Sequence, residues 1–324
     1  MRSEFISALT ELAQADPRIV FLTADLGYTV VEPFREKFPE RFFNVGVAEQ
    51  NMMGIATALA KEGFLPFVYS IANFAVLRPL EFIRNGPINH QLPVRIIGVG
   101  SGFDYGSAGI THYNLEDIAV LRPQKGLTLA IPADKNQIKT MLEKTVDLPG
   151  PVYYRIAKGG AASITGLQNK FGLGEVIELS EGKDIAIVTM GAMVPEVMKA
   201  SDILSSKGIF SSVYVVSAFN PSCDEAIKEI LGKFPMVMSV EDHYTTGGLG
   251  SFVCETIAQS QLACRAVVCG VDAKTIKTTG SRDFMNEHYG LSAAQLAEKA
   301  VMSLKRFGNE KPSYLHNTSY PQTV

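Results

Sequence analysis

The stretch Phe42-Phe43-Asn44-Val45-Gly46-Val47-Ala48-Glu49-Gln50-Asn51-Met52-Met53-Gly54 contains the strand-to-helix junction from which the fold can be predicted. Apolar residues alternate up to Val47, which predicts a strand, and residues 50–61 have helical spacing without proline. Glu49 therefore lies at the junction, with little charge near it in the sequence. On these residues alone, a helix N-terminal carboxylate stabilised by the helix dipole is favoured over a functional carboxylate in a cleft.

Strand and helix patterns alternate through residues 1–158, which we expect to form one domain. Strands alternating with helices of about 10–15 residues predict an α/β fold with a mostly parallel, doubly wound sheet. Ligands of such sheets bind beyond the carboxyl ends of the strands. Several polar segments follow predicted strands and are candidates for such a site: Asp25, Glu49, Ser70, the loop 100–112 and Arg155.

A second, smaller α/β domain is predicted at residues 183–306, again from alternating strand and helix patterns. Residues 159–182 separate the two domains and contain a run of glycine and small polar residues, which predicts a linker. Residues 307–324 are polar, contain two prolines and show no period, which predicts a terminal tail.

The composition indicates a soluble globular protein. A length of 324 residues suits two domains, and a formal net charge of −3 does not indicate a nucleic-acid or membrane partner. No apolar run is long enough to span a bilayer. The four cysteines match no common zinc pattern and no secretory segment precedes them, so we expect reduced thiols, a cytoplasmic location and no metal site on this chain.

Single residues leave their roles open. His112 follows a glycine-containing loop and suits either a proton-transfer role or a structural bond to backbone. Arg155 suits an anionic substrate, although an ion pair is favoured on position alone. Phe74 suits a stacking surface but would usually be core. The segment Glu241-Asp242-His243 favours a capping or interface role over a metal site, and the glycine-rich loop 98–102 is a weak phosphate signal without a P-loop lysine.

Taken together, the motifs resemble the C-terminal half of transketolase, which consists of a pyrimidine-binding domain for thiamine diphosphate and a C-terminal domain. The resemblance covers roughly residues 2–305 in order and spacing. It implies two doubly wound domains. The matching pieces are Thr23-Ala24-Asp25-Leu26, residues 44–51, Pro66 through Phe74, Gly109-Ile110-Thr111-His112, Leu121-Arg122-Pro123, Pro132-Ala133-Asp134, Tyr154-Arg155, Glu241-Asp242-His243 and Gly247-Gly248-Leu249-Gly250-Ser251.

The resemblance also implies roles for individual residues. Glu49 matches the glutamate that binds the aminopyrimidine ring of the cofactor and activates it, and His112 matches a histidine that contacts sugar oxygens. Arg155 matches an arginine that binds the substrate phosphate, and Arg2 is a second candidate. The remaining cofactor-site positions are Phe74, Ile71, Leu77, Asp25, Leu26 and Gln50.

Two substitutions depart from the family pattern. Ala108 stands where transketolase has an aspartate that reads a substrate hydroxyl, and Gly100 replaces a histidine that helps to bind phosphate. Asp104 or Tyr105 are candidates to read the substrate instead. We therefore expect a specialised acceptor rather than the ordinary pentose phosphate alone.

The Gly-Asp-Gly motif, which holds Mg²⁺ in the family, does not occur in the 324 residues. The resemblance therefore implies a split transketolase, in which a separate N-terminal subunit holds Mg²⁺ and the diphosphate. We expect two copies of each subunit in a heterotetramer. The alternatives are a subunit of a deoxyxylulose-phosphate-synthase-like or 2-oxoacid-dehydrogenase-like enzyme, or a non-catalytic regulatory homologue.

Overall fold

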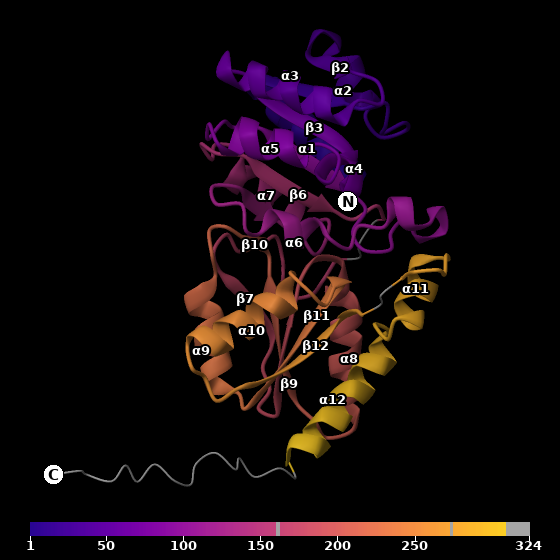
Figure 1. The fold of residues 1–324 in the computed structure, drawn as a ribbon, viewed down its shortest axis with the longest axis vertical. Coiled ribbons are helices and arrows are strands. Elements are labelled where there is room, and N and C mark those ends of the chain that lie inside the picture. Colours follow the sequence, from indigo (N-terminus) through magenta and orange to yellow (C-terminus); the bar gives the residue numbers. More distant parts are fainter. Residues whose placement is uncertain (160–162, 273–274, 309–324) are drawn as a thin grey trace, which may run out of the picture.

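The computed structural model describes residues 1–159, 163–272 and 275–308, which fold into two α/β units that lie end to end (Figure 1). The first unit has a seven-stranded sheet in the order β10-β5-β6-β4-β3-β1-β2. All of its strands are parallel except β10, which is antiparallel to β5. The strands are β1 (Ile19–Thr23), β2 (Phe42–Asn44), β3 (Leu65–Ile71), β4 (Arg95–Val99), β5 (Thr128–Ala130), β6 (Val152–Ile156) and β10 (Ala218–Phe219).

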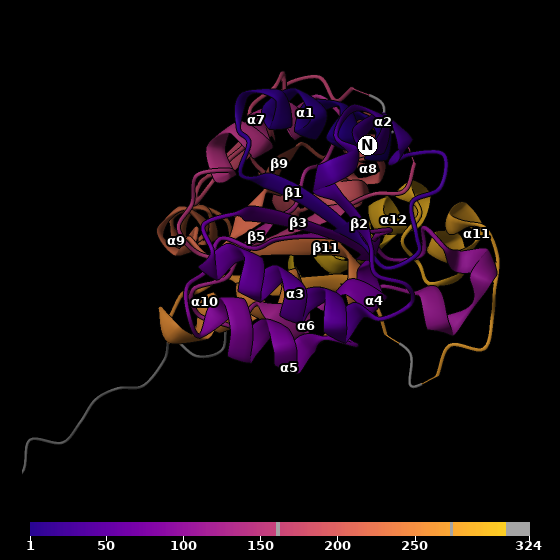
Figure 2. The same cartoon turned by 90° about the horizontal axis from the view of Figure 1, so that it is seen from above.

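Helices cover both faces of this sheet, so the predicted doubly wound architecture is confirmed (Figure 2). One face carries α1 (Arg2–Ala15), α2 (Glu32–Lys37) and α7 (Gln137–Thr145), and the other carries α3 (Glu49–Lys61), α4 (Ala72–Val76), α5 (Leu80–Ile83) and α6 (Asp117–Leu121). The amphipathic pattern of residues 2–15 explains the place of α1, because its apolar face is buried against the sheet.

The second unit has a five-stranded sheet in the order β12-β11-β8-β9-β7, with β7 antiparallel to β9. Its strands are β7 (Val176–Ser180), β8 (Ile185–Thr189), β9 (Ser211–Val216), β11 (Met236–Tyr244) and β12 (Arg265–Val271). Helices α8 (Val194–Ser206) and α12 (Ala293–Gly308) lie on one side, α9 (Asp224–Lys233) and α10 (Leu249–Gln259) on the other, and α11 (Arg282–His288) lies towards the first unit (Figure 1). Among the described residues, no helix combines the length and apolar character needed to cross a membrane.

Four predictions need correction. The linker prediction is wrong for residues 176–180, which form β7, because β7 is a partly exposed edge strand beside a glycine-rich run and has only a weak local pattern. The strand before Glu49 ends at Asn44 rather than Val47. The sequence pattern predicts one helix over residues 71–85, but the structure breaks it between α4 and α5, where Pro79 follows Arg78. The predicted tail begins inside α12, and residues 309–324 lie outside the described residues.

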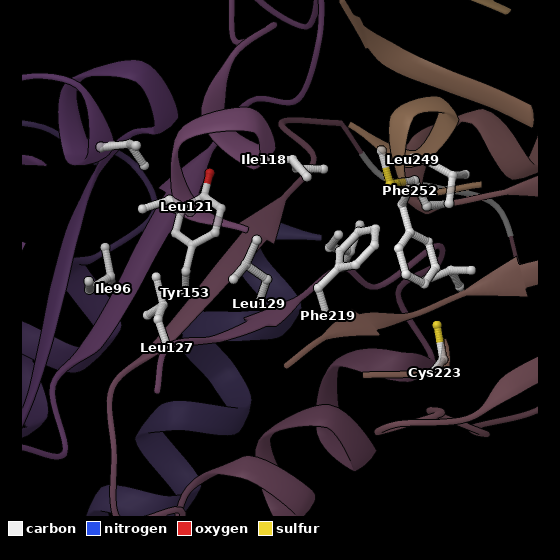
Figure 3. Close-up of a cluster of buried hydrophobic side chains, with 14 of the residues drawn as sticks. Ile96, Ile118, Leu121, Leu127, Leu129, Tyr153, Phe219, Cys223, Leu249 and Phe252 are labelled. Carbon is white, nitrogen blue, oxygen red and sulfur yellow. The ribbon is translucent and has the colours of Figure 1, made fainter. Parts of the chain in front are cut away.

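One cluster of buried apolar side chains extends across both units. Figure 3 shows side chains of the first sheet, among them Leu129 and Tyr153, continuing through Phe219 of β10 to Phe252 of α10. The rings of Phe219 and Phe252 meet edge to face, with centroids 5.5 Å apart. Because β10 belongs to the second half of the sequence but completes the first sheet, the two units are not independent layers.

We expect Phe67→Ala to lower the free energy of unfolding by about 3–5 kcal/mol, because a large core side chain is removed and a cavity remains. Phe67 lies in the middle of β3 and is fully buried. Urea unfolding followed by circular dichroism measures the effect. The exposed Phe64, three residues earlier, is the control, and a loss for Phe67→Ala as small as that for Phe64→Ala would contradict this account of the core.

Candidate functional site

The loops after β1 and β2 are held together at the carboxyl edge of the first sheet. The Asp25 carboxylate accepts hydrogen bonds from the Tyr28 hydroxyl at 2.6 Å and the Asn44 amide at 3.0 Å. The backbone N–H of Asp25 donates to Asn44 Oδ1 at 2.9 Å. The hydrogen bond from Tyr28, followed by that from Asn44, holds the pKa of Asp25 below its usual value. Asp25 and Leu26 therefore lie in a fixed turn at the edge where ligands of such sheets bind.

Glu49 is the first residue of α3, and the residue is only 3% exposed. Contrary to the sequence prediction, it has a charged neighbour: Arg78 Nη1 donates to both carboxylate oxygens, at 2.8 and 2.9 Å. Arg78 comes from the break between α4 and α5, and its backbone carbonyl accepts from Gln50 Nε2 at 3.2 Å. The Glu49 carboxylate thus lies at a helix N-terminus and is also buried. The structure is therefore compatible with both interpretations of the sequence, the helix N-terminal carboxylate and the carboxylate in a cleft.

An apolar wall adjoins this ion pair. Ile71 ends β3 and is buried, Phe74 lies in α4 one turn later, and Leu77 ends the same segment with an exposed side chain. The guanidinium of Arg78 lies 3.8 Å from the Phe74 ring centroid. A hollow of about 540 Å³ opens beside these groups and is lined by Val47, Ala48, Glu49, Gln50, Asn51 and Arg78.

His112 also lies against Phe74. It ends the short helix η4 (Ile110–His112), and its ring meets Phe74 with centroids 5.2 Å apart. Its Nδ1 lies 2.9 Å from the Thr111 hydroxyl, and the Asn73 amide donates to the Thr111 carbonyl. The Asn73 contact ties the loop carrying His112 to α4, which holds the imidazole beside the aromatic face.

Tyr105 and Lys158 end the row. The Tyr105 ring lies 6.3 Å from His112, between centroids, and Lys158 Nζ lies 4.4 Å from the Tyr105 centroid. Arg2 Nε donates to the backbone carbonyl of Lys158 at 3.0 Å, so two cationic residues lie at this corner beside Tyr105. Burial raises the pKa of Tyr105, and the Arg2 charge partly opposes that shift. We define the strand-end row as Glu49, Arg78, Phe74, His112, Tyr105 and Lys158.

The structure explains the glycine at position 100. Gly100 has φ +92°, and a Cβ placed there would lie 2.4 Å from Cε2 of Tyr105. A side chain at this position would therefore collide with the tyrosine ring and strain the backbone. Tyr105 therefore fills the space that a side chain at position 100 would need.

The structure contradicts the predicted substrate role of Arg155. Its side chain is 1% exposed, Nε donates to Asp117 Oδ2 at 2.8 Å and Nη1 donates to Asp242 Oδ1 at 2.6 Å. Nη2 donates to the carbonyls of Asn114 and Asp242, both at 3.1 Å. Burial opposes the charge of Arg155, but Asp117 and Asp242 outweigh it and raise its pKa. The guanidinium is occupied by the junction of the two units and is not open to a phosphate.

Asp104 is likewise not available to form a hydrogen bond with a substrate hydroxyl. Its carboxylate is 4% exposed and lies 3.3 Å from Arg282 Nη1. It accepts from the backbone N–H of Lys158 at 2.8 Å and of Ser101 at 3.1 Å. Asp104 therefore fixes the loop after β4 against the end of β6 and against α11, which corrects the predicted substrate contact.

The segment Glu241-Asp242-His243 has the capping and interface role that the sequence favoured. Glu241 accepts from the N–H groups of Leu249 and Gly250 at 2.7 and 2.8 Å, at the start of α10. Burial raises the pKa of Glu241 to about 7, against the effect of both hydrogen bonds. His243 Nε2 accepts from the backbone N–H of Ala119 at 3.3 Å, across the two units. In the part of the chain that the structure describes, no three His, Cys, Asp or Glu side chains are grouped to hold a metal ion.

Comparisons with known proteins agree with this architecture. Residues 1–161 match the model of the transketolase pyrimidine-binding domain, and residues 174–296 match that of the transketolase C-terminal domain. The chain belongs to the transketolase family. Among its relatives is a putative transketolase C-terminal section from Methanocaldococcus jannaschii, 33% identical over 94% of this chain and 96% of that protein. The chain therefore corresponds to the C-terminal half of transketolase as carried by split enzymes.

Two further relatives support this assignment. A subunit of an apulose-4-phosphate transketolase from Phocaeicola vulgatus is 33% identical over 94% of this chain and 97% of that protein. A solved split-gene transketolase, described as an inactive β4 tetramer, is 33% identical with a TM-score of 0.84, and the match covers 94% of this chain and 98% of that one. Membership of the transketolase family implies the use of thiamine diphosphate.

The residues present fit the pyrimidine end of that cofactor. An aminopyrimidine is a flat ring with hydrogen-bonding nitrogens, and the site offers the buried Glu49 carboxylate beside the aromatic face of Phe74. The sequence did not single out Arg78 or Lys158. Arg78 could have been noticed because Pro79 interrupts an otherwise helical pattern directly after it. Lys158 carries no comparable signal, since a lysine shortly after a strand usually lies on the solvated surface.

We expect Arg155→Ala to lower the free energy of unfolding by about 3–5 kcal/mol, because it leaves two buried carboxylates without their partner. Urea unfolding measures this loss, and Arg35→Ala, which removes an exposed guanidinium, is the control. An Arg155→Ala variant of parental stability with a raised KM for phosphorylated substrates would restore the substrate-binding role.

Proposed function

We propose that this chain is the C-terminal subunit of a thiamine-diphosphate-dependent transketolase, which transfers a two-carbon ketol unit between sugar or sugar-phosphate substrates. The observation that carries the proposal is the strand-end row, in which a buried carboxylate, an aromatic face and a histidine lie side by side. These groups come from three separate strand ends of one sheet edge. Such a grouping is typical of a functional cleft rather than of helix capping.

In this proposal Glu49 holds a proton-exchanging hydrogen bond to the aminopyrimidine ring, and Phe74 provides its stacking surface. Ile71 and Leu77 add apolar contact, which excludes water from the carboxylate. The turn of Asp25 and Leu26, together with Gln50, borders the same pocket. When bound, thiamine diphosphate supplies the nucleophilic carbon and the electron sink for breaking and forming the carbon–carbon bond.

His112 lies where an imidazole can donate to, or take a proton from, an oxygen of the sugar. With Arg155 and Asp104 engaged elsewhere, Arg2 and Lys158 are the cations that we assign to an anionic group of the substrate. Ala108 offers no hydrogen bond from its side chain, so hydroxyl recognition differs from that of ordinary transketolase. The Phocaeicola vulgatus relative is named for apulose 4-phosphate, and a phosphorylated sugar substrate of that kind suits the Arg2–Lys158 corner.

The partner in this proposal is an N-terminal subunit that binds Mg²⁺ and the diphosphate. The sequence lacks Gly-Asp-Gly, and the described residues contain no metal-binding group of side chains. We place two copies of this chain and two of its partner in an α2β2 assembly. The relative described as an inactive β4 tetramer fits a subunit that requires its partner.

Mixing experiments test the whole proposal. The chain alone, the partner alone and the mixture are assayed with thiamine diphosphate and Mg²⁺ against ketose phosphates, hydroxypyruvate and pyruvate. We expect ketol transfer in the mixture only. Turnover of pyruvate in place of ketol donors would favour the synthase alternative, and ordinary transketolase rates on xylulose and ribose phosphates would contradict a specialised acceptor.

Glu49→Gln should reduce kcat of the assembled complex at least about 100-fold, because the amide cannot exchange the proton that the carboxylate handles. Subunit assembly, followed by light scattering, should be preserved. Glu62→Gln, at the exposed end of α3, is the matched control and should retain parental turnover. Turnover of Glu49→Gln comparable with that of Glu62→Gln would remove Glu49 from the mechanism.

Lys158→Met should raise KM for a phosphorylated acceptor by roughly tenfold, since a charge-assisted contact to an anion is lost. The KM for hydroxypyruvate as donor should change less. Lys207→Met, in the second unit, serves as the control for removal of an exposed ammonium. An unchanged KM for phosphorylated acceptors would exclude Lys158 from the substrate site.

A further inference from the structure

Arg78 occupies a position that the proposed function gives to the cofactor. Its guanidinium is bonded to both oxygens of Glu49 and lies 3.8 Å from the centroid of Phe74. These are the two side chains that the proposed function assigns to the aminopyrimidine ring. One guanidinium therefore covers both the hydrogen-bonding and the stacking partner of that ring.

A guanidinium and an aminopyrimidine have in common the properties needed to bind between Glu49 and Phe74. Both are flat, both can donate N–H groups to a carboxylate, and both stack on an aromatic face. Because the same surfaces cannot be covered twice, binding of the ring requires Arg78 to leave. We propose that Arg78 is an internal stand-in for the cofactor ring, which masks Glu49 in the free subunit and is displaced on loading. This inference rests on the proposed function and adds a competition within the site.

The geometry allows this displacement. Arg78 lies in the break between α4 and α5, with 44% of its side chain exposed. In the described part of the chain, both hydrogen bonds of its guanidinium go to Glu49, whereas its backbone carbonyl is held by Gln50. The side chain can therefore swing into the adjoining hollow of about 540 Å³ while the backbone stays anchored.

The Arg78–Glu49 ion pair also stabilises the free subunit. A buried, unpaired carboxylate is costly, and Glu49 is 3% exposed. Arg78 satisfies Glu49 before the cofactor arrives, so loading exchanges one planar donor for another. The exchange stabilises the free subunit and lowers its affinity for the ring, which delays loading until the partner adds its diphosphate and Mg²⁺ contacts.

Thiamine without the diphosphate is a suitable probe, because it carries the aminopyrimidine but needs no metal. Its Kd is measured by isothermal titration calorimetry, with the full chain alone and with the assembled complex. Arg78→Ala should lower this Kd by about tenfold, since the probe no longer displaces an ion pair and a cation–π contact. Arg84→Ala is the matched control, because Arg84 is an exposed arginine of the same segment that bonds Asn85 instead of Glu49.

Arg78→Gln provides a second variant that keeps a donating amide without the charge, and its Kd should fall between those of the parent and Arg78→Ala. Circular dichroism establishes that each variant is folded. A Kd for Arg78→Ala equal to or higher than that of the parent overturns the inference, as does the absence of measurable thiamine binding in every variant.

The same measurements separate this inference from the proposed function. If Glu49→Gln abolishes ketol transfer while Arg78→Ala binds thiamine as the parent does, the function stands and the stand-in role is wrong. If Arg78→Ala binds thiamine more tightly but the complex transfers no ketol unit from any donor, the stand-in role stands and the proposed reaction is wrong.

Discussion

The buried guanidinium of Arg155 fixes the geometry of the whole chain. It joins Asp117 of the first unit to Asp242 of the second and also binds the Asn114 carbonyl. Asn114 pairs through its backbone with Gly102, so the same contact closes the base of the loop that carries Tyr105 and His112. A charge network of this kind is costly unless every partner is in place, which makes the relative position of the two units specific.

Most of the fold could be predicted, because its central elements have clear periods. The buried strands β1, β3, β4 and β6 consist mostly of apolar residues, and α1 and α3 show helical spacing. The elements that escaped prediction have weak local signals. Strand β10 has two residues and no period to detect, and β7 is a half-exposed edge strand beside a glycine-rich run. Their place is set by the partner strands β5 and β9, which no local pattern reveals.

The candidate site could be predicted only in part. Glu49, Phe74 and His112 were named from the resemblance to a family, and the structure brings them into one row. The assignments of Arg155 and Asp104 failed for a physical reason: a charged residue after a strand has the same sequence signal whether it faces a ligand or a distant carboxylate. The partner of Arg155 in the second unit, Asp242, lies 87 positions away in the chain. Arg78 was not predicted as a site residue because its role depends on its contacts with Glu49 and Phe74, which the sequence does not show.

Strand β10 has a consequence for how a protein of this family can be divided into separate chains. Residues 218–219 follow β9 of the second sheet, yet they complete the edge of the first sheet next to β5. A chain cut between the two units would leave the edge of β5 unpaired, and an open sheet edge favours aggregation. The segment between the two units is therefore not a place where the chain can be divided without loss, because the second half of the sequence supplies an edge strand of the first sheet.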